Sequence, residues 1–377
     1  MFEKLILSGS FGLALGAHHS VILMPVGTVW STAISFRGVD CSAGFVKAFT
    51  QAIPSGAVAV TAGIDFSLVL KQDGSVWAMG RNSRGQLGDG TKLRKKKFIR
   101  IETISGVKDI AAGGYHSMVL TPAGQVWTSG WNKYGQLGYG QLGDGLTQYS
   151  KTFRPAIADG VIAVAAGDLH SVALKRDQSV WAAGRNNYGQ LGDRSNKDTG
   201  IFVKVMDSGV VTVAAGGYHS MVLKHDGSVW ATGYNDCGQL GTGSETFKNE
   251  YEQVVSSGVK SIAAGSRHSM VLKQDGSVWT TGYNEFGQLG DGWTSNRNVF
   301  VQVISDMTSV IAAGMSHSMV VKQDGSIWAT GSNKDCQICD DWTVTNTKFT
   351  RISPLRNGVR HGTNICIWIH LYNLAIT

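Results

Sequence analysis

Residues Ala214–Gly243 have the sequence AAGGYHSMVLKHDGSVWATGYNDCGQLGTG, and close copies of this stretch occur along the chain. The glycines that close the Ala-Ala-Gly element, or a weaker variant of it, are Gly16, Gly63, Gly113, Gly167, Gly216, Gly265 and Gly314. Successive glycines are 47, 50, 54, 49, 49 and 49 residues apart, and the longest step contains a duplicated GQLG motif within Gly135–Gly145. These seven copies indicate a repeat architecture in which each unit packs against its neighbours.

Each unit contains short runs of β-branched and aromatic residues separated by turn residues. Within Val211–Gly243 the runs are VTVAA, HSMVLK and SVWATG, which are too short for helices. Asp226-Gly227 separates the second run from the third, and an Asp-Gly pair predicts a hairpin because its turn needs positive φ. A fourth run, such as Phe202–Val205 or Tyr251–Val254, precedes each unit. The pattern predicts an all-β fold, a seven-bladed β-propeller of four-stranded antiparallel blades.

The sequences of the two ends of the chain do not determine which end closes the ring. Residues Phe2–Gly9 match the opening run of a unit, and Phe349–Ile352 resembles the start of an eighth unit. Either terminus could therefore complete the last blade. We predict one propeller domain over residues 1–359 and a divergent segment over 360–377, where an apolar run of twelve residues replaces the repeat.

Composition narrows the class of protein. With 49 glycines, 5 prolines and 16% charged residues, the chain is neither disordered nor collagen-like. It has no apolar stretch long enough for a membrane-spanning helix, and Leu13–Ala17 fits the repeat register better than a secretory signal. Five scattered cysteines do not form a disulfide framework, so we expect an intracellular protein, cytoplasmic or nuclear.

The positive charge is concentrated in one basic segment. The net charge is +7, and all but one unit of it comes from Lys92, Arg94, Lys95, Lys96, Lys97 and Arg100. A nucleic-acid-binding face needs cations spread over many phosphates, so direct nucleic-acid binding is not expected. We place this basic loop in a turn between units, either as a solvated loop or as a nuclear-import or acidic-partner contact.

The recurring signature AAGGYHSMVL, DGSVWATG and YNxxGQLGDG resembles the regulator of chromosome condensation repeat family, across roughly residues 2–352. This resemblance implies a seven-bladed propeller. It does not fix a function, because the family includes exchange factors for Ran-type GTPases, ligase-associated modules, plant ultraviolet receptors and bacterial enzyme inhibitors.

Two aromatic positions repeat in every unit and are interpreted as structural. The tryptophans are Trp30, Trp77, Trp127, Trp181, Trp230, Trp279 and Trp328, and we expect them to fill the gaps between blades. The histidines are His19, His116, His170, His219, His268 and His317, with Phe66 in the remaining unit. Residues spread around a ring cannot converge on one zinc ion, so we expect each histidine to hydrogen-bond backbone groups where the strand begins.

The glycine motifs are also interpreted as structural. In Gly85–Gly88 and its copies the glycines allow positive φ, the leucine fills the core, and an asparagine such as Asn82 ties the turn. Cys336 and Cys339 stand where this motif has its glycines, so the CxxC pair is interpreted as an eroded repeat and not as half a zinc site. We therefore expect neither a metal nor another cofactor.

The residues between the repeated glycine and histidine vary from unit to unit, and loops on a rigid ring are where binding specificity resides. The candidate partner-binding residues at these positions are Asp65, Tyr115, Asp168, Tyr218 and Arg267. Tyrosine and arginine are frequent at interface hot spots. In the family's exchange factors, acidic residues at these positions face the GTPase, and Asp65 and Asp168 match them here. No insertion resembles the wedge with which such factors reach the nucleotide site.

These observations favour a non-catalytic propeller, expected to be monomeric, that binds a protein partner through its Gly-x-x-His loops. The alternative is a guanine-nucleotide exchange factor for a Ran-type small GTPase. A third hypothesis is a degenerating gene product, which rests on the eroded first and last units. No arrangement of nucleophile and base is identifiable from residue spacing.

Overall fold

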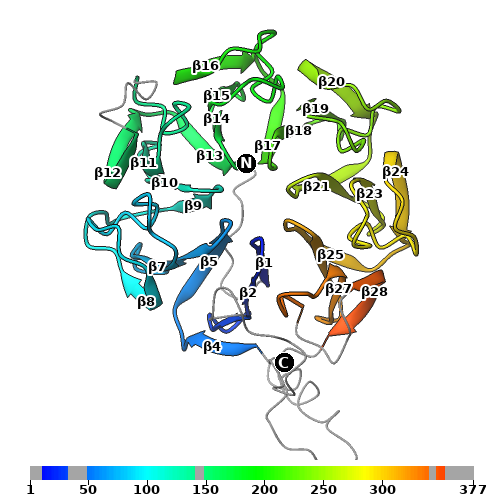
Figure 1. Ribbon diagram of the computed structural model, residues 1–377, viewed down its shortest axis with the longest axis horizontal. Helices are drawn as coiled ribbons and strands as arrows, with labels where there is room; N and C mark the ends of the chain where they lie inside the picture. Colours follow the sequence, from blue (N-terminus) through cyan, green and yellow to red (C-terminus); the bar gives the residue numbers. More distant parts are fainter. Residues whose placement is uncertain (1–10, 33–48, 141–147, 339–344, 353–377) are drawn as a thin grey trace, which may run out of the picture.

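The computed structural model describes residues 11–32, 49–140, 148–338 and 345–352. Within these ranges the chain forms seven four-stranded antiparallel sheets arranged as blades around a central axis (Figure 1). The predicted seven-bladed β-propeller is confirmed. No helix among the described residues is long and apolar enough to cross a membrane.

Each blade consists of four strands that follow one another in the sequence, from the axis to the rim. The innermost strands are β1 (Gly12–Leu15), β5 (Ala57–Ala62), β9 (Asp109–Ala112), β13 (Val161–Ala166), β17 (Val210–Ala215), β21 (Val259–Ala264) and β25 (Thr308–Ala313). The second strands are β2 (Ser20–Leu23), β6 (Phe66–Lys71), β10 (His116–Leu120), β14 (His170–Lys175), β18 (His219–Lys224), β22 (His268–Lys273) and β26 (His317–Lys322).

The two remaining strands of each blade lie farther from the axis. The third strands are β3 (Val29–Ser31), β7 (Val76–Gly80), β11 (Val126–Trp131), β15 (Val180–Gly184), β19 (Val229–Gly233), β23 (Val278–Gly282) and β27 (Ile327–Ser332). The outer strands are β4 (Thr50–Ile53), β8 (Lys95–Arg100), β12 (Tyr149–Ile157), β16 (Thr199–Met206), β20 (Lys248–Val255), β24 (Arg297–Ile304) and β28 (Thr345–Ile352). We number the blades one to seven in chain order.

The fourth run of the repeat completes the blade before it and does not open the next one. In blade five, Trp230 of β19 lies opposite Gln253 of β20. The run Phe349–Ile352 is therefore no surplus strand, because it belongs to β28 and pairs with β27 in blade seven. Of the two termini that could complete the last blade, the C-terminal one does so. Residues Phe2–Gly9 and the eroded Gly38–Cys41 lie outside the described residues.

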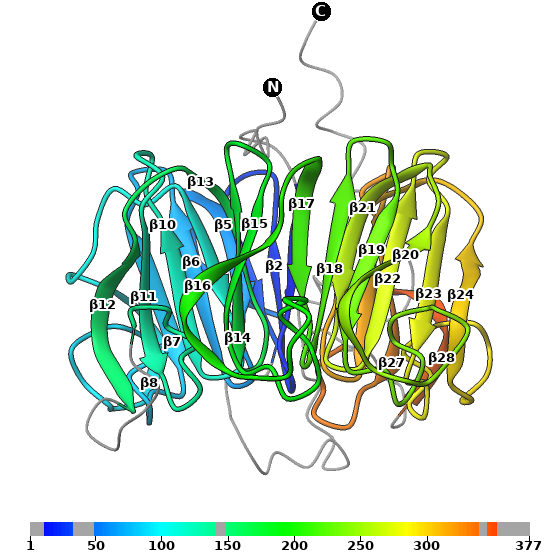
Figure 2. The same cartoon turned by 90° about the horizontal axis from the view of Figure 1, so that it is seen from above.

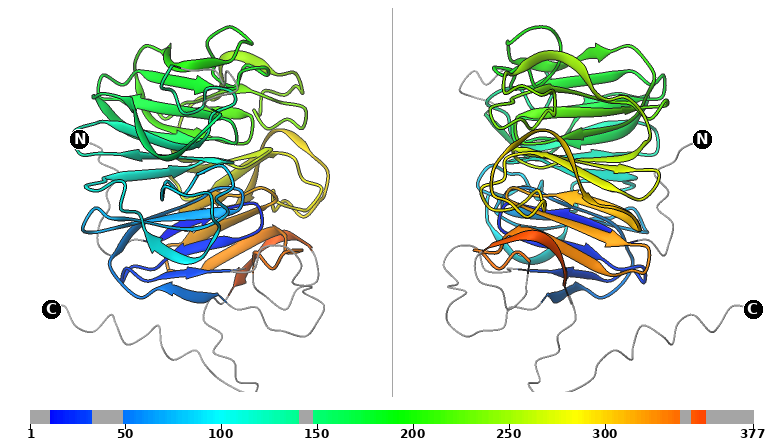
Figure 3. Two further views of the ribbon diagram at one scale, coloured as in Figure 1. Left: turned by 60° about the vertical axis from the view of Figure 1, so that its left-hand side comes forward. Right: turned by 90° about the vertical axis from the view of Figure 1, so that its right-hand side faces the viewer.

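The core lies between blades, where the apolar faces of neighbouring sheets meet. Leu174 and Val180 of blade four pack with Val210 and Val222 of blade five, and Trp230 packs against this cluster. Figure 3 shows the blades stacked face to face in this way. Strands buried on both faces explain why the repeat has near-continuous apolar runs where an exposed sheet would alternate. The predicted role of the tryptophans in packing between blades agrees with this arrangement.

Six of the seven blade junctions contain a hydrogen bond between a histidine and a serine. The histidine Nε2 lies 2.7–2.9 Å from the serine Oγ of the next blade in the pairs His19–Ser67, His116–Ser171, His170–Ser220, His219–Ser269, His268–Ser318 and His317–Ser20. The expectation that these histidines bond backbone groups is therefore wrong. The partner is a side chain, because the ring crosses the gap between blades at the start of the second strand. Phe66 leaves the junction of blades two and three without this bond.

The hydrogen-bond pattern fixes the tautomer of five of these histidines, His116, His170, His219, His268 and His317, because their serine partners each donate to a glutamine carbonyl. Ser269 donates its hydroxyl proton to the carbonyl of Gln239 at 2.7 Å, so it must accept a proton from His219 Nε2. The Nδ1 atom of His219 then carries a lone pair, and it has no hydrogen-bond partner among the described residues. Burial lowers the pKa of His219 to about 4 and that of His116 to about 3, so both rings are neutral at pH 7.

The ring closes where blade seven meets blade one, by the same contacts as the other junctions. His317 Nε2 lies 2.9 Å from Ser20 Oγ, and Ser20 donates to the carbonyl of Gln337 at 2.6 Å. Leu15 and Ile22 pack with Met319 of blade seven in one buried cluster. No blade is shared between the two ends of the described chain, so side-chain packing, these bonds and a backbone bond from the Met315 N–H to the Gly16 carbonyl at 3.3 Å hold the ring closed.

The GQLG turns have the predicted structure. Gly85 and Gly88 have φ of 79° and 72°, and Leu87 is fully buried. The Leu87 N–H donates to Asn82 Oδ1 at 3.0 Å, as the equivalent residues do in other blades. Cys336 takes the place of the first glycine with φ of 57°, which supports the interpretation of an eroded repeat. Cys339 lies outside the described residues.

The sequence suggested that the basic segment is a turn between units, but this prediction is wrong. Lys95, Lys96 and Lys97 belong to β8, the outer strand of blade two, and Lys92 and Arg94 lie in the loop before it. Strand pairing extends through this segment because half-buried Phe98 and Ile99 supply its apolar side. Exposed lysines on an outer strand discourage edge-to-edge pairing with another sheet.

Some of these cations already have partners. Lys95 Nζ forms an ion pair with Asp89 at 3.0 Å, and Lys92 Nζ lies 3.2 Å from the Tyr149 hydroxyl. Lys96 and Lys97 are exposed.

Candidate functional site

The variable loops and the loops after the third strands lie on one face of the ring. In an antiparallel blade, the first-to-second and third-to-fourth connections fall at the same end of the strands. Figure 2 shows the strands running from this face to the opposite one. We call it the Gly-x-x-His face and define it by residues 16–19, 63–66, 113–116, 167–170, 216–219, 265–268 and 314–317. The third-strand loops on it are residues 81–84, 131–134, 185–188, 234–237, 283–286 and 332–335.

Backbone hydrogen bonds tie the two kinds of loop together in each of blades two to seven. In blade five the Tyr234 N–H donates to the Tyr218 carbonyl at 2.8 Å. Gly233 precedes Tyr234 with φ of 110°, and a Cβ on it would lie 2.5 Å from that same carbonyl oxygen. The glycine therefore lets the loops approach this closely. Side chains on these loops are presented by a rigid frame.

The two variable positions of each Gly-x-x-His loop lie in different surroundings. The first position faces the axis of the ring, where Ala17, Ile64, Asp168, Gly217, Ser266 and Met315 line a central cavity. The second position contacts the third-strand loops, as Asp65 does with Arg81 and Tyr115 with Trp131. A loop thus contributes one residue to the axis and one to the surrounding surface.

The second-position residues of blades two and three form the start of a continuous contact chain. The Arg81 guanidinium lies 3.3 Å from Asp65 Oδ2 and 5.4 Å from the centre of the Tyr115 ring. Tyr115 packs edge-on against Trp131 with ring centres 5.6 Å apart. Arg84 lies over the other side of this cluster, 5.1 Å from the Trp131 ring.

The chain of contacts continues across blades three to six. Arg185 lies 4.9 Å from the centre of the Tyr134 ring and 5.5 Å from that of Tyr218. Tyr218 packs edge-on against Tyr234 at 6.3 Å between ring centres. Arg267 lies 5.8 Å from the Tyr234 ring and also pairs with Asp236. Its guanidinium is 5.0 Å from the ring of Tyr283 in the loop of its own blade.

We call this set of side chains the aromatic–cationic band. It comprises Arg81, Arg84, Tyr115, Trp131, Lys133, Tyr134, Arg185, Tyr188, Tyr218, Tyr234, Arg267 and Tyr283. Aromatic rings hold the guanidinium groups in fixed positions. Arg81 and Arg267 use part of their edges in the pairs with Asp65 and Asp236. Burial is the main cause of the raised pKa of Tyr218, and nearby Asp168 adds to it.

Three cations of the band have no acidic partner among the described residues. They are Arg84, Lys133 and Arg185, which contact the rings of Trp131, Tyr134 and Tyr218. Arg185 Nε donates to Asn187 Oδ1 at 2.8 Å, which leaves its charge uncompensated. The stretch over blades two to four is therefore positive and aromatic.

All five candidate partner-binding residues lie on the Gly-x-x-His face, but the structure separates the two carboxylates. Asp65 is paired with Arg81 at the end of the band. Asp168 lies at the cavity and forms no ion pair within the described chain. Burial raises the pKa of Asp168 to about 6, so its carboxylate is held where charge is poorly solvated. The other three residues, Tyr115, Tyr218 and Arg267, belong to the band.

Sequence reasoning missed most of the band. Arg81, Trp131, Arg185, Tyr234 and Tyr283 follow the glycine at or next to the end of the third strand, and this position varies between units as strongly as the Gly-x-x-His pairs do. The same criterion of variation within a constant repeat would have found them. That the two loops lie side by side follows from the antiparallel order of the strands within the predicted blade, and not from the loop sequences themselves.

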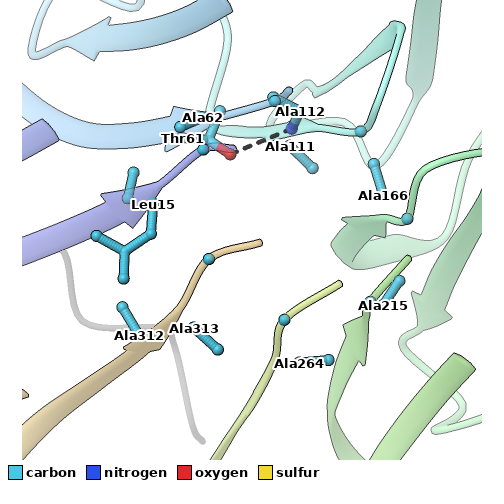
Figure 4. Close-up of a pocket in the computed structure, with 18 of the residues that line it drawn as sticks. Leu15, Thr61, Ala62, Ala111, Ala112, Ala166, Ala215, Ala264, Ala312 and Ala313 are labelled. Carbon is cyan, nitrogen blue, oxygen red and sulfur yellow. Dashed lines mark hydrogen bonds between the residues drawn. The ribbon is translucent and has the colours of Figure 1, made fainter. Parts of the chain in front are cut away.

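The cavity on the axis is bounded by the innermost strands of all seven blades. Its volume is about 330 Å³. Figure 4 shows alanine side chains such as Ala111, Ala215 and Ala312 around this space, and the Ala112 N–H donating to Thr61 Oγ1 at 3.1 Å. The Ala-Ala-Gly element of the repeat thus forms the wall of the cavity.

Comparison with protein families matches this chain to the RCC1-like domain over residues 139–370. The chain belongs to this family. Two models of the regulator of chromosome condensation (RCC1) repeat also match, one over residues 73–120 and the other over residues 57–86 and 107–136. Comparison with curated protein sequences gives no significant match.

Solved structures similar to this RCC1-like propeller share its fold at low sequence identity. Saccharomyces cerevisiae Prp20p, described with its binding properties to Gsp1p and histones, has 22% identity and a TM-score of 0.71, over 79% of this chain and 77% of that chain. Human WBSCR16 has 23% identity and a TM-score of 0.70, over 84% of this chain and 88% of that chain. Yeast RCC1 (Prp20) bound to Kap60 has 22% identity and a TM-score of 0.70, over 79% of this chain and 75% of that chain.

Proposed function

We propose that this RCC1-like propeller is a non-catalytic interaction protein that binds an acidic protein partner through the aromatic–cationic band. The observation that carries the proposal is the position of Arg84, Lys133 and Arg185, which stack on aromatic rings without an acidic partner in the described chain. Arginine, tyrosine and tryptophan dominate the binding energy of protein interfaces. The stacking also orders these side chains before binding, which reduces the entropy lost on association.

A charge-removal variant tests this proposal. Arg84→Ala, Lys133→Ala and Arg185→Ala are combined in one protein, which is compared with wild type by affinity purification and quantitative mass spectrometry. We expect partners of the wild-type protein to bind the variant at least about tenfold more weakly, since hot-spot residues cost about 2 kcal/mol each or more. Binding should also weaken with added salt, because the partner is acidic.

The control removes three exposed cations near the opposite face, Lys108, Arg176 and Lys260, by the same alanine substitutions. It changes the net charge equally and leaves the band intact. Partners that bind wild type and control but not the band variant support the proposal. Partners lost equally from both variants, or from neither, overturn it.

The second candidate is guanine-nucleotide exchange on a Ran-type small GTPase. Family membership and the carboxylate of Asp168, which has no ion pair within the described chain, favour it. Release of a fluorescent nucleotide from such a GTPase tests the candidate in wild type, Asp168→Ala and Asp65→Ala. Because Asp65 is already paired with Arg81, stimulated release should depend more strongly on Asp168. Absence of stimulated release rejects exchange and leaves the interaction proposal in place.

A further inference from the structure

Nearly all of the side chains that line the cavity on the ring axis are apolar, whereas polar atoms, largely of the backbone, form a large part of its surface. The innermost strands contribute alanine, valine, leucine and isoleucine side chains, and Thr61 and Ser266 are the uncharged polar residues that line it. Thr61 Oγ1 accepts a hydrogen bond from the Ala112 N–H (Figure 4). The volume of about 330 Å³ is at the lower end of the range for small-molecule sites, ~300–1,000 Å³.

Asp168 is the charged residue among those that line this space. No hydrogen bond or ion pair of its carboxylate occurs within the described residues, and it keeps part of its surface open to the cavity. A carboxylate surrounded by protein without a compensating cation is costly, so such groups generally serve a site. Packing alone gives no reason for a charge at this position, because the equivalent residues Ala17, Ile64 and Met315 are apolar.

Gly217 of the neighbouring blade packs closely against the carboxylate. Gly217 is the equivalent residue of blade five, and a Cβ on it would lie 3.2 Å from Asp168 Oδ2. That same Cβ would lie 3.0 Å from Ser266 Oγ, so Gly217 sits between the carboxylate and the hydroxyl. The Gly217 backbone therefore covers the side of Asp168 toward blade five, and a ligand would reach the carboxylate from the cavity, where part of the Asp168 surface is exposed.

We propose that the axial cavity binds an alkylammonium group, with the cation at the Asp168 carboxylate and the methylene chain along the alanine-lined wall. The opposite charge of the ligand offsets the cost of the buried carboxylate, and the apolar wall removes the methylenes from water. This site is distinct from the aromatic–cationic band and does not depend on the proposed partner. Both a free aliphatic amine and the lysine side chain of another protein supply this chemistry.

The carboxylate of Asp168, as the charged group at the cavity, favours an ammonium over other cations. No group of three or more histidine, cysteine or acidic residues that could hold a metal occurs in the described part of the chain. Calcium takes six to eight oxygen ligands, and the single carboxylate supplies at most two of them. A guanidinium presents five donors in a planar fork, of which one carboxylate accepts two in a bidentate pair.

Direct binding of n-hexylammonium to the purified protein tests the proposal, with calorimetry as the readout and neutral n-hexanol as the comparison. We expect the wild type to bind hexylammonium, and Asp168→Asn to bind it at least about tenfold more weakly, since truncating one partner of a buried charge pair is strongly unfavourable. Hexanol should bind both proteins equally. Asp65→Asn is the matched control, because it removes a carboxylate on the same face outside the cavity. Equal hexylammonium affinity for wild type and Asp168→Asn overturns the proposal.

A second variant keeps the test valid if Asp168→Asn folds poorly. Ala215 lines the cavity (Figure 4), and Ala215→Leu should fill the space and abolish hexylammonium binding while the carboxylate remains. Undiminished binding to a folded Ala215→Leu protein would place the amine elsewhere and contradict the proposal.

A further probe distinguishes the two sources of the ammonium. N-acetyl-lysine methylamide carries the same cation on a peptide backbone. Asp168-dependent binding of this compound supports a lysine of another protein as the ligand, whereas Asp168-dependent binding of hexylammonium alone supports a free amine. Failure of both compounds to bind wild type rejects the site.

Discussion

The serine that follows each repeated histidine is the residue through which one blade is fixed to the next. In five cases, of which Ser269 is one, this serine accepts a proton from the histidine of the preceding blade and donates its own to a glutamine carbonyl of that blade. Ser269 and Ser117 differ in only one of these bonds. Ser117 donates to the Gln86 carbonyl at 2.6 Å, but Phe66 stands where a histidine would donate to it.

This difference allows the histidine bond to be measured in isolation. We expect Ser269→Ala to lower the free energy of unfolding by about 1–3 kcal/mol more than Ser117→Ala does, because it leaves the buried N–H of His219 without an acceptor. Both serines are fully buried, so the cavities that the substitutions create are alike. Urea unfolding of the two variants gives the comparison. Equal losses would show that the histidine bond adds nothing to the junction.

At the scale of strands and loops, only part of the structure could be predicted from the sequence. Alternating turn and strand residues predicted the blade, its hairpin and the GQLG turn, because these depend on local backbone conformation and recur seven times. The sequence could not show that the fourth run belongs to the preceding blade. A loop separates this run from the third strand, such as β19, and the length of the loop does not determine whether the run turns back to pair with that strand or continues into the next blade. The same ambiguity placed Lys95–Lys97 in a turn and not in β8.

Residues of the aromatic–cationic band were predicted only where they stood in a recognised motif. Variation at the Gly-x-x-His loops identified Tyr115, Tyr218 and Arg267, which the structure places in the band. Asp168 was grouped with Asp65 because both are acidic and occur in equivalent loops. The structure separates them because neighbouring positions of a tight loop point in different directions, one toward the axis and one toward the next loop.

At the scale of the whole molecule, the buried histidines make stability depend on pH. Burial lowers the pKa values of all six to about 3 or 4, well below the ordinary value of 6.5. Between those values and pH 6.5 the unfolded chain binds protons that the folded ring excludes. Stability is therefore fully present above pH 6.5 and is lost as the pH falls below it. Asp168 has the opposite effect on stability, because its raised pKa favours the folded state as the pH falls. The contribution of this single group opposes those of six histidines.

We expect the free energy of unfolding to fall by several kcal/mol per pH unit below about pH 5.5, since each histidine contributes up to about 1.4 kcal/mol per unit. Chemical unfolding between pH 4.5 and 7.5 measures this slope. His116→Phe introduces the residue that blade two has at this position, Phe66. It should reduce the slope by the contribution of one proton, up to about 1.4 kcal/mol per pH unit. An unchanged slope in this variant would mean that the ring of histidines does not determine the acid sensitivity.

The central claim is that a uniform ring presents one binding face, made by the loops that depart from the repeat. Hydrogen–deuterium exchange of the protein with and without a purified partner tests it most directly. Protection is predicted in residues 81–84, 131–134 and 185–188, with the hairpins of the opposite face unchanged. Protection confined to those opposite hairpins, which include residues 72–75 and 225–228, would contradict the claim.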